Sequence, residues 1–242
     1  MSIFSDAERY PQYVERLILI SPAGVSHETE EIIAKRRARQ SSSWRWSILG
    51  SFYAHLFYPN FSFGNIIRMA PSWSERKCLE YVEKRIPDIK DEDERKAVSR
   101  YLFMNSRLPG SGEHCLSRFL NPYGFGRRPA ETRISHLQIP HVCFLYGQND
   151  WMDAEGGLNV QKLCEEKGSG EAPTVDVYQI SDAGHLLMLD NWQEFNIGMA
   201  LAVGLQPRDN DTRPVRLVPG RYVPGHDEAE TWRRTPNESV AT

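Results

Sequence analysis

This 242-residue chain has no long apolar run, no paired cysteines and no large excess of one charge. Its longest apolar stretches, ILGSFYAHLFY and FNIGMALAVGL, reach about half the length that a membrane-spanning helix needs. The four cysteines (Cys78, Cys115, Cys143 and Cys164) include no C-x-x-C pair, which argues against a zinc site and a disulfide framework. The net charge of -3 gives no overall attraction to nucleic acid. These absences predict an intracellular protein without a bound metal and without a nucleic-acid partner.

Three short runs predict strands: RLILIS at 16–21, HVCFLYG at 141–147 and TVDVYQIS at 174–181. The first two are continuous apolar runs, which is typical of buried strands. Helix-like segments follow the second and third runs, GGLNVQKLCEEKG and NWQEFNIGMALAVGL. Strands that alternate with helices are joined by right-handed crossovers and lie parallel. The sequence therefore predicts an α/β protein with three parallel strands.

Residues 26–138, between the first two predicted strands, have helical patterning. SHETEEIIAKRRARQ, SERKCLEYVEKRI and DEDERKAVSRYLFM each place apolar residues at helical spacing. A long helical insertion between sheet strands is how a cap or lid is built, so this segment is expected to be one. Residues 207–242 are polar, proline-rich and aperiodic, and are expected to form a disordered tail.

Two loops follow the second and third predicted strands and carry the candidate catalytic residues. YGQNDWMD contains Asp150, and SDAGH ends with His185. Because ligands bind at the carboxyl ends of parallel strands, these two side chains are expected to face one another. An aspartate that holds a histidine is the acid–base part of a Ser–His–Asp triad. Asp153 lies three residues beyond Asp150 and is an alternative acid.

Several motifs resemble one family. FLYGQNDWMD and ISDAGHLLMLDN look like the last two catalytic loops of α/β hydrolases, and RLILISPAG looks like the sixth strand of that fold. With LPGSGEHCLSRFL, the pattern is similar to the lipid-acting branch that contains the lipid-droplet lipase coactivator and fungal mitochondrial cardiolipin deacylases. The resemblance implies a hydrolase core at 1–25 and 139–206, a cap at 26–138 and a tail at 207–242.

The nucleophile of that family is missing from the chain. The family's G-x-S-x-G motif lies shortly before the sixth strand, and no G-x-S-x-G occurs in these residues. Ser26 follows a strand in GVSHE, but Glu28 stands where the strained elbow needs a small residue, so Ser26 is expected to cap a helix. The resemblance thus implies the C-terminal half of a hydrolase, inactive as given because it holds no nucleophile.

Asp190 completes a His-x4-Asp pattern with His185, which the resemblance links to acyl transfer. The alternative is structural, because Asp190 and Gln193 have the spacing of a capping box before a helix. We expect the cap.

Two features allow contact with a membrane surface. The aromatic residues of 44–73 suit either a lipid-facing surface or the core of a cap, and a core is expected. KRRAR at 35–39 suits either anionic headgroups or a solvated helix face.

The resemblance implies a serine-type acyl-ester hydrolase of lipids, a phospholipid or lysophospholipid deacylase that needs no cofactor. Two alternatives stay open: a non-catalytic lipid-binding or coactivator protein on the same fold, and a lysophospholipid acyltransferase. The resemblance to fungal deacylases implies a mitochondrial location, and a cytoplasmic one is the alternative.

Overall fold

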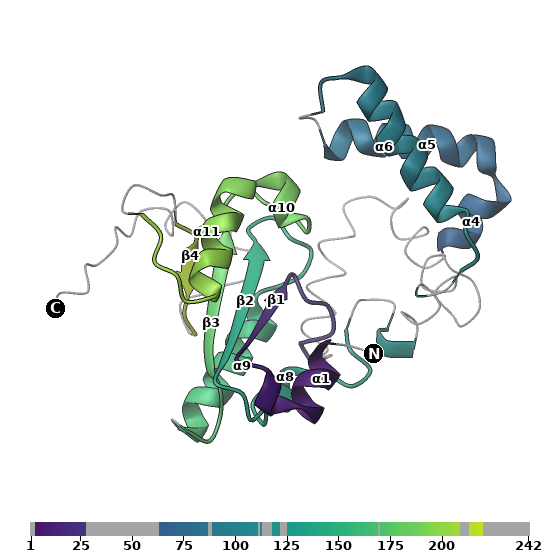
Figure 1. The fold of residues 1–242 in the computed structure, drawn as a ribbon. Coiled ribbons are helices and arrows are strands. Elements are labelled where there is room, and N and C mark those ends of the chain that lie inside the picture. The colour runs from purple at the N-terminus through teal and green to yellow at the C-terminus, as the bar shows by residue number, and fades with distance from the viewer. Residues whose placement is uncertain are drawn as a thin grey trace, which may run out of the picture.

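A computed structural model describes residues 3–27, 63–86, 89–110, 112, 118–121, 125–168, 170–208 and 213–219. Within these residues a four-stranded sheet has the order β1-β2-β3-β4 (Figure 1). The strands are β1 Arg16–Ile20, β2 His141–Gly147, β3 Thr174–Ile180 and β4 Val215–Leu217. The first three are parallel, which confirms the α/β prediction, and β4 runs antiparallel to β3.

Strand β4 lies within the stretch that the sequence predicts to be a disordered tail. That prediction is wrong for residues 215–217, because they complete the outer edge of β3. Leu217 pairs with Val177 and is buried against the core, and Arg216 forms an ion pair with Asp176. So short a strand, flanked by polar and proline-rich residues, has too few positions for its alternating pattern to be recognised in the sequence.

Helices cover both faces of the sheet (Figure 1). Val142 and Phe144 face a core shared with α9, whereas the alternate residues Cys143 and Leu145 face a second core beneath α11. This alternation follows from the two-residue period of a strand. The elements that pack around the sheet are α1 Ile3–Arg9, η1 Pro11–Tyr13, α8 Glu131–Ile134, α9 Glu155–Lys167, α10 Leu187–Asp190 and α11 Trp192–Ala202.

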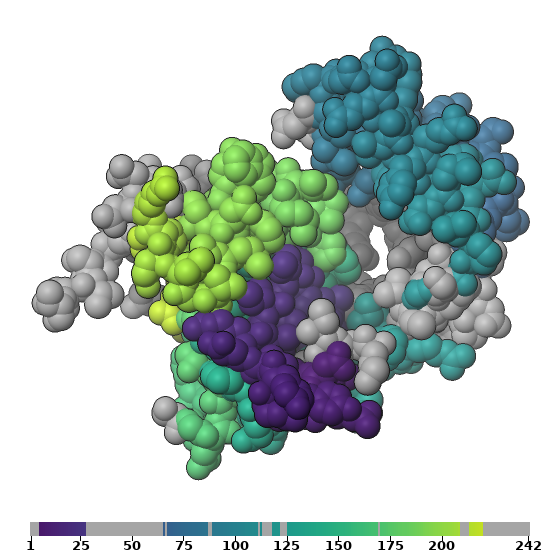
Figure 2. All heavy atoms as spheres, in the orientation of Figure 1, coloured from purple at the N-terminus to yellow at the C-terminus, as the bar shows by residue number. Residues whose placement is uncertain are grey.

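The insertion between β1 and β2 contains the helices α4 Phe63–Met69, α5 Pro71–Arg85 and α6 Glu92–Ser106. These three pack on one another. Figure 2 shows them as a blue-to-teal lobe beside the green surface of α10 and α11. Asp91 begins α6 by accepting a hydrogen bond from the Glu94 N–H at 2.7 Å. The helices predicted over 74–86 and 91–104 are thus confirmed, whereas the one expected after Ser26 lies outside the described residues.

The insertion leaves and rejoins the core at one place. The Ala130 N–H donates to the Gly24 carbonyl at 3.1 Å, and the Glu131 N–H donates to the Val25 carbonyl at 3.0 Å. Gly24 takes a φ of 80°, which favours glycine. Because α8 follows directly and Ile134 is fully buried beneath α9, the core resumes before the boundary expected at residue 139.

Across the described ranges, no helix is both long and apolar enough to pass through a bilayer.

Candidate active site

The structure brings His185 and Asp150 together. Asp150 follows β2 and His185 follows β3, and these adjacent parallel strands end at the same edge of the sheet. The His185 Nδ1 atom lies 3.1 Å from Asp150 Oδ1 and 3.5 Å from Oδ2. The carboxylate is 0% exposed and the imidazole 38% exposed. A buried acid therefore holds a ring whose remaining edge is accessible.

The surroundings of Asp150 favour the charged carboxylate. Burial raises the pKa of the Asp150 carboxyl, but the hydrogen bond from His185, the nearby Ser21 hydroxyl and the Met152 N–H outweigh it and lower the pKa below its ordinary value. The Met152 N–H donates to Oδ1 at 3.0 Å. Ser21 Oγ is buried but reaches no hydrogen-bond geometry with any described residue, so the His185 and Met152 contacts are the firmer ones.

The two loops are also fixed to each other through their backbones. The Asn149 N–H donates to the Ala183 carbonyl at 2.8 Å, and the Gln148 N–H donates to the Ile180 carbonyl at 2.9 Å. A Cβ on Gly147 would lie 2.3 Å from the Gly184 carbonyl oxygen. The acid and histidine loops thus pack so closely that Gly147, the last residue of β2, has no room for a side chain.

Asp153, the alternative acid, lies two residues before α9. Its Oδ1 accepts a hydrogen bond from the Glu155 N–H at 3.0 Å. The neighbour of His185 is Asp150, so the geometry favours Asp150 as the partner of the histidine.

Asp190 does not cap α11, and the predicted capping box is wrong by one residue. The cap is Asn191, whose Oδ1 accepts from the Glu194 N–H at 3.2 Å. Asn191 Nδ2 also donates to the Ser181 carbonyl at 2.9 Å and to Glu194 Oε2 at 3.0 Å. These extra bonds select Asn191. Asp190 instead ends α10, where its Oδ2 accepts from the Gly184 N–H at 2.8 Å.

Replacing Asn191 by alanine is expected to lower the free energy of unfolding by about 2 kcal/mol, because it removes a helix cap and two further hydrogen bonds. Gln193→Ala, at the exposed position of the predicted box, is the matched control and is expected to stay within about 0.5 kcal/mol of the parent. Denaturant unfolding monitored by circular dichroism measures both. A larger loss for Gln193→Ala would contradict this assignment.

Ser26 lies against the first turn of α9. A Cβ on Gly156 would come within 2.4 Å of Ser26 Oγ and 3.2 Å of the Ser26 backbone nitrogen. No hydroxyl group in the described parts of the chain hydrogen bonds to His185. The helix that Ser26 was expected to cap is outside those parts, so that prediction stays a prediction.

An exposed aromatic side chain lies beside His185. The Trp151 ring lies 5.1 Å from the imidazole between centroids and is tilted by 50°. Trp151 is exposed, and so are Met188, Leu189 and Trp192 on α10 and at the start of α11. Of the aromatic stretch 44–73, residues 44–62 lie outside the described residues, as does 35–39, whereas Met69 and Trp73 are exposed on α4 and α5.

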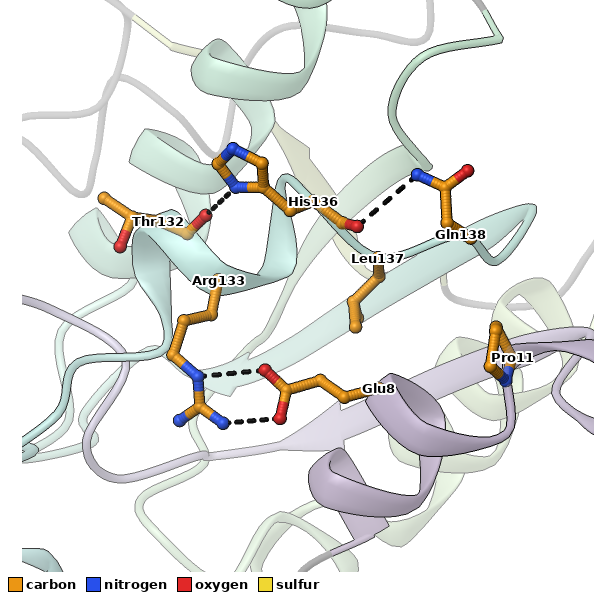
Figure 3. Close-up of a pocket in the computed structure, with 7 residues that line it drawn as sticks. All are labelled: Glu8, Pro11, Thr132, Arg133, His136, Leu137 and Gln138. Atoms are coloured by element: carbon orange, nitrogen blue, oxygen red, sulfur yellow. Dashed lines mark hydrogen bonds and ion pairs between the residues drawn. The ribbon is translucent and has the colours of Figure 1, made fainter.

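A cavity of about 390 Å³ lies elsewhere, between α1, η1 and α8 (Figure 3). These elements precede β1 and β2, so the cavity is at the amino ends of the strands, opposite His185. The polar side chains that line it have partners within the chain: Arg133 donates to Glu8 at 3.0 and 2.6 Å, and His136 Nδ1 lies 2.7 Å from the Thr132 carbonyl. No cluster of three metal-ligating side chains occurs among the described residues.

The chain is similar in sequence to several curated proteins. A probable 1-acylglycerol-3-phosphate O-acyltransferase from Oryza sativa is 29% identical over 78% of this chain and 44% of its own length. An abhydrolase domain-containing protein, abhd-5.2 from Caenorhabditis elegans, is 28% identical over 79% of this chain and 38% of its own. A (lyso)-N-acylphosphatidylethanolamine lipase from Bos taurus is 24% identical over 63% of this chain and 42% of its own.

These relatives confirm the resemblance to lipid-acting α/β hydrolases that the loop motifs predicted. The chain spans less than half the length of each of those three relatives. No protein-family model matches it. Among solved structures, carboxylesterase CesB (YbfK) from Bacillus subtilis aligns with a TM-score of 0.41, at 17% identity, over 84% of this chain and 55% of that one.

Two residues of this site were not predicted from the sequence. Ser21 directly follows β1 with a φ of 42°, and its place at the carboxyl end of a strand was a usable signal. Arg85, which reaches Asp190 from α5, lies 105 residues away in sequence and has no local signal.

Proposed function

We propose that His185 and Asp150 are the base and acid of a serine-type acyl-ester hydrolase that deacylates phospholipids or lysophospholipids. The observation that carries this proposal is the hydrogen bond between Nδ1 of an accessible imidazole and a fully buried carboxylate. With Asp150 ionised, Nδ1 keeps its proton and Nε2 carries the lone pair. That is the tautomer a general base needs.

The reaction proceeds in two steps on this pair. Nε2 of His185 takes the proton of a serine hydroxyl as its oxygen attacks the acyl carbon, and then protonates the departing lysolipid oxygen. In the second step Nε2 takes a proton from water, the hydroxide oxygen bonds to the acyl carbon, and the proton returns to the serine as the fatty acid leaves. The serine would come from a G-x-S-x-G segment that these 242 residues do not contain. No cofactor takes part.

Lipid as the substrate class is supported by two observations. Trp151, exposed beside His185, offers apolar contact for an acyl chain, and Met188, Leu189 and Trp192 are exposed on the segment that follows the histidine in sequence. The relatives from rice and cattle are named as a probable 1-acylglycerol-3-phosphate O-acyltransferase and a (lyso)-N-acylphosphatidylethanolamine lipase.

Acyl transfer is the second candidate, favoured by the name of the rice relative. A lysophospholipid hydroxyl would replace water in the second step, and the same histidine would take its proton. A non-catalytic lipid-binding protein is the third.

The test uses the longest reading frame that contains residues 1–242, incubated with phosphatidylcholine labelled in its acyl chains. Labelled fatty acid that disappears in His185→Ala supports the hydrolase. Labelled phosphatidic acid formed only when lysophosphatidic acid is added supports the transferase. Vesicle binding with neither product overturns both enzymatic proposals. The 242-residue chain alone is expected to resist labelling by a fluorophosphonate.

A further inference from the structure

We propose that Arg85 and Asp190 are positioning residues for His185. They hold the backbone directly before the histidine and tie it to helix α5 of the insertion. This inference rests on the proposed function, in which His185 is the base, and gives the His-x4-Asp aspartate a role that the sequence pattern does not state.

The Asp190 carboxylate is bound from two sides. Its Oδ2 accepts from the Gly184 N–H at 2.8 Å, and Gly184 immediately precedes His185. Arg85 Nη1 lies 3.3 Å from Oδ1 and Nη2 lies 3.3 Å from Oδ2, a two-pronged contact that suits a planar guanidinium. The side chains are 31% exposed for Arg85 and 15% for Asp190, so the pair is partly shielded from water.

The peptide before His185 is therefore held on both sides. Gly147 packs beneath it, since a Cβ there would meet the Gly184 and Ala183 carbonyl oxygens, and Asn149 donates to the Ala183 carbonyl. Asp190 closes the other side through the Gly184 N–H. The imidazole itself hydrogen bonds to Asp150, so Asp190 acts on the position of the ring through the backbone.

Arg85 connects this arrangement to the insertion. It is the last residue of α5, which packs with α4 and α6. If α5 moves away, the guanidinium leaves and Asp190 keeps only the Gly184 N–H. The position of the α4–α6 helices is thereby transmitted to the loop that carries His185.

The experiment measures amide hydrogen exchange by NMR in the complete 242-residue chain. Gly184 exchange is expected to rise about ten- to a hundredfold in Asp190→Ala, because a hydrogen bond to a charged acceptor is lost. In Arg85→Gln it is expected to rise about two- to fivefold, because a partly exposed ion pair is removed. The His185 ring N–H resonance is expected to shift in both variants.

Conservative variants and local controls separate positioning from general loosening. Asp190→Asn keeps an oxygen for Gly184 and is expected to raise exchange less than Asp190→Ala does. Arg85→Lys is expected to restore most of the protection that Arg85→Gln loses. Arg76→Gln, which removes a surface pair with Glu80 on the same helix, is expected to leave Gly184 unchanged, as is the Leu145 amide of β2 in every variant.

Unchanged Gly184 exchange in both Asp190→Ala and Arg85→Gln overturns the proposal, and so does a rise that Leu145 shares. The outcome is independent of catalysis. If Gly184 responds as expected while the longest reading frame shows no acyl-ester turnover, the proposed function fails and the positioning pair stands. If turnover is present and Gly184 exchange does not respond, the proposed function stands and the positioning role of Arg85 and Asp190 fails.

Discussion

Replacing Asp150 by asparagine is expected to lower kcat of the acyl-ester reaction by about 10⁴-fold in the longest form that shows turnover. The carboxylate is fully buried and its pKa is held low, after the opposing effect of burial, by hydrogen bonds from His185 and the Met152 N–H and by the nearby Ser21 hydroxyl. It therefore supplies a fixed negative charge beside Nδ1. Asparagine fills the same space without that charge, so the imidazolium formed during proton transfer is no longer stabilised. Steady-state release of labelled fatty acid measures the effect.

Asp153→Asn is the matched control, since the same change falls in the same loop. Asp153 accepts a hydrogen bond from the Glu155 N–H at the start of α9. Asparagine keeps an oxygen that can accept this hydrogen bond, so the replacement is expected to change stability by less than about 0.5 kcal/mol and to leave kcat within about twofold. If Asp153→Asn lost more activity than Asp150→Asn, Asp153 and not Asp150 would be the acid that serves His185.

Gly147→Ala is expected to lower the free energy of unfolding by about 3 kcal/mol, at the upper end for an overpacked site. The new methyl group would lie 2.3 and 2.4 Å from the carbonyl oxygens of Gly184 and Ala183. Backbone atoms cannot swing aside as a flexible side chain does, so the histidine loop must shift. The substitution is thus expected both to lower stability and to displace His185. Urea unfolding and the His185 ring resonances report the two effects.

Gly112→Ala separates this effect from the general cost of altering a glycine. A Cβ at position 112 meets no atom within 4 Å, so the substitution is expected to change stability by less than about 0.5 kcal/mol. If Gly147→Ala were as mild, the close packing of the two loops would not be what positions His185.

The sheet and the acid–histidine pair could be predicted because their causes are local. A strand buried on both faces leaves an apolar run such as HVCFLYG, and the loop after it must lie at the carboxyl edge. Because Asp150 and His185 follow adjacent parallel strands, their contact could be predicted from the order of the strands and loops alone.

What could not be predicted depends on contacts between distant segments. Asn191 and Asp190 are both residue types suited to cap a helix. Which of them caps α11 depends on hydrogen bonds to distant residues: Asn191 donates to the Ser181 carbonyl, whereas Asp190 accepts from the Gly184 N–H. The short β4 exists because β3 offers a free edge. Arg85 contacts Asp190 because the insertion folds so that the end of α5 lies near α10, and the spacing of apolar residues in the sequence does not predict that path.

The hydrogen bonds that join Gly24 to Ala130 and Val25 to Glu131 have an evolutionary consequence. Everything between those residues begins and ends at one point on the core, so its length can change without moving β1 or β2. Relatives with the same loops around the histidine are then free to carry insertions of different size and composition. The segment can diverge in sequence while β1 and β2 stay in place, provided that α5 keeps the Arg85 contact with Asp190.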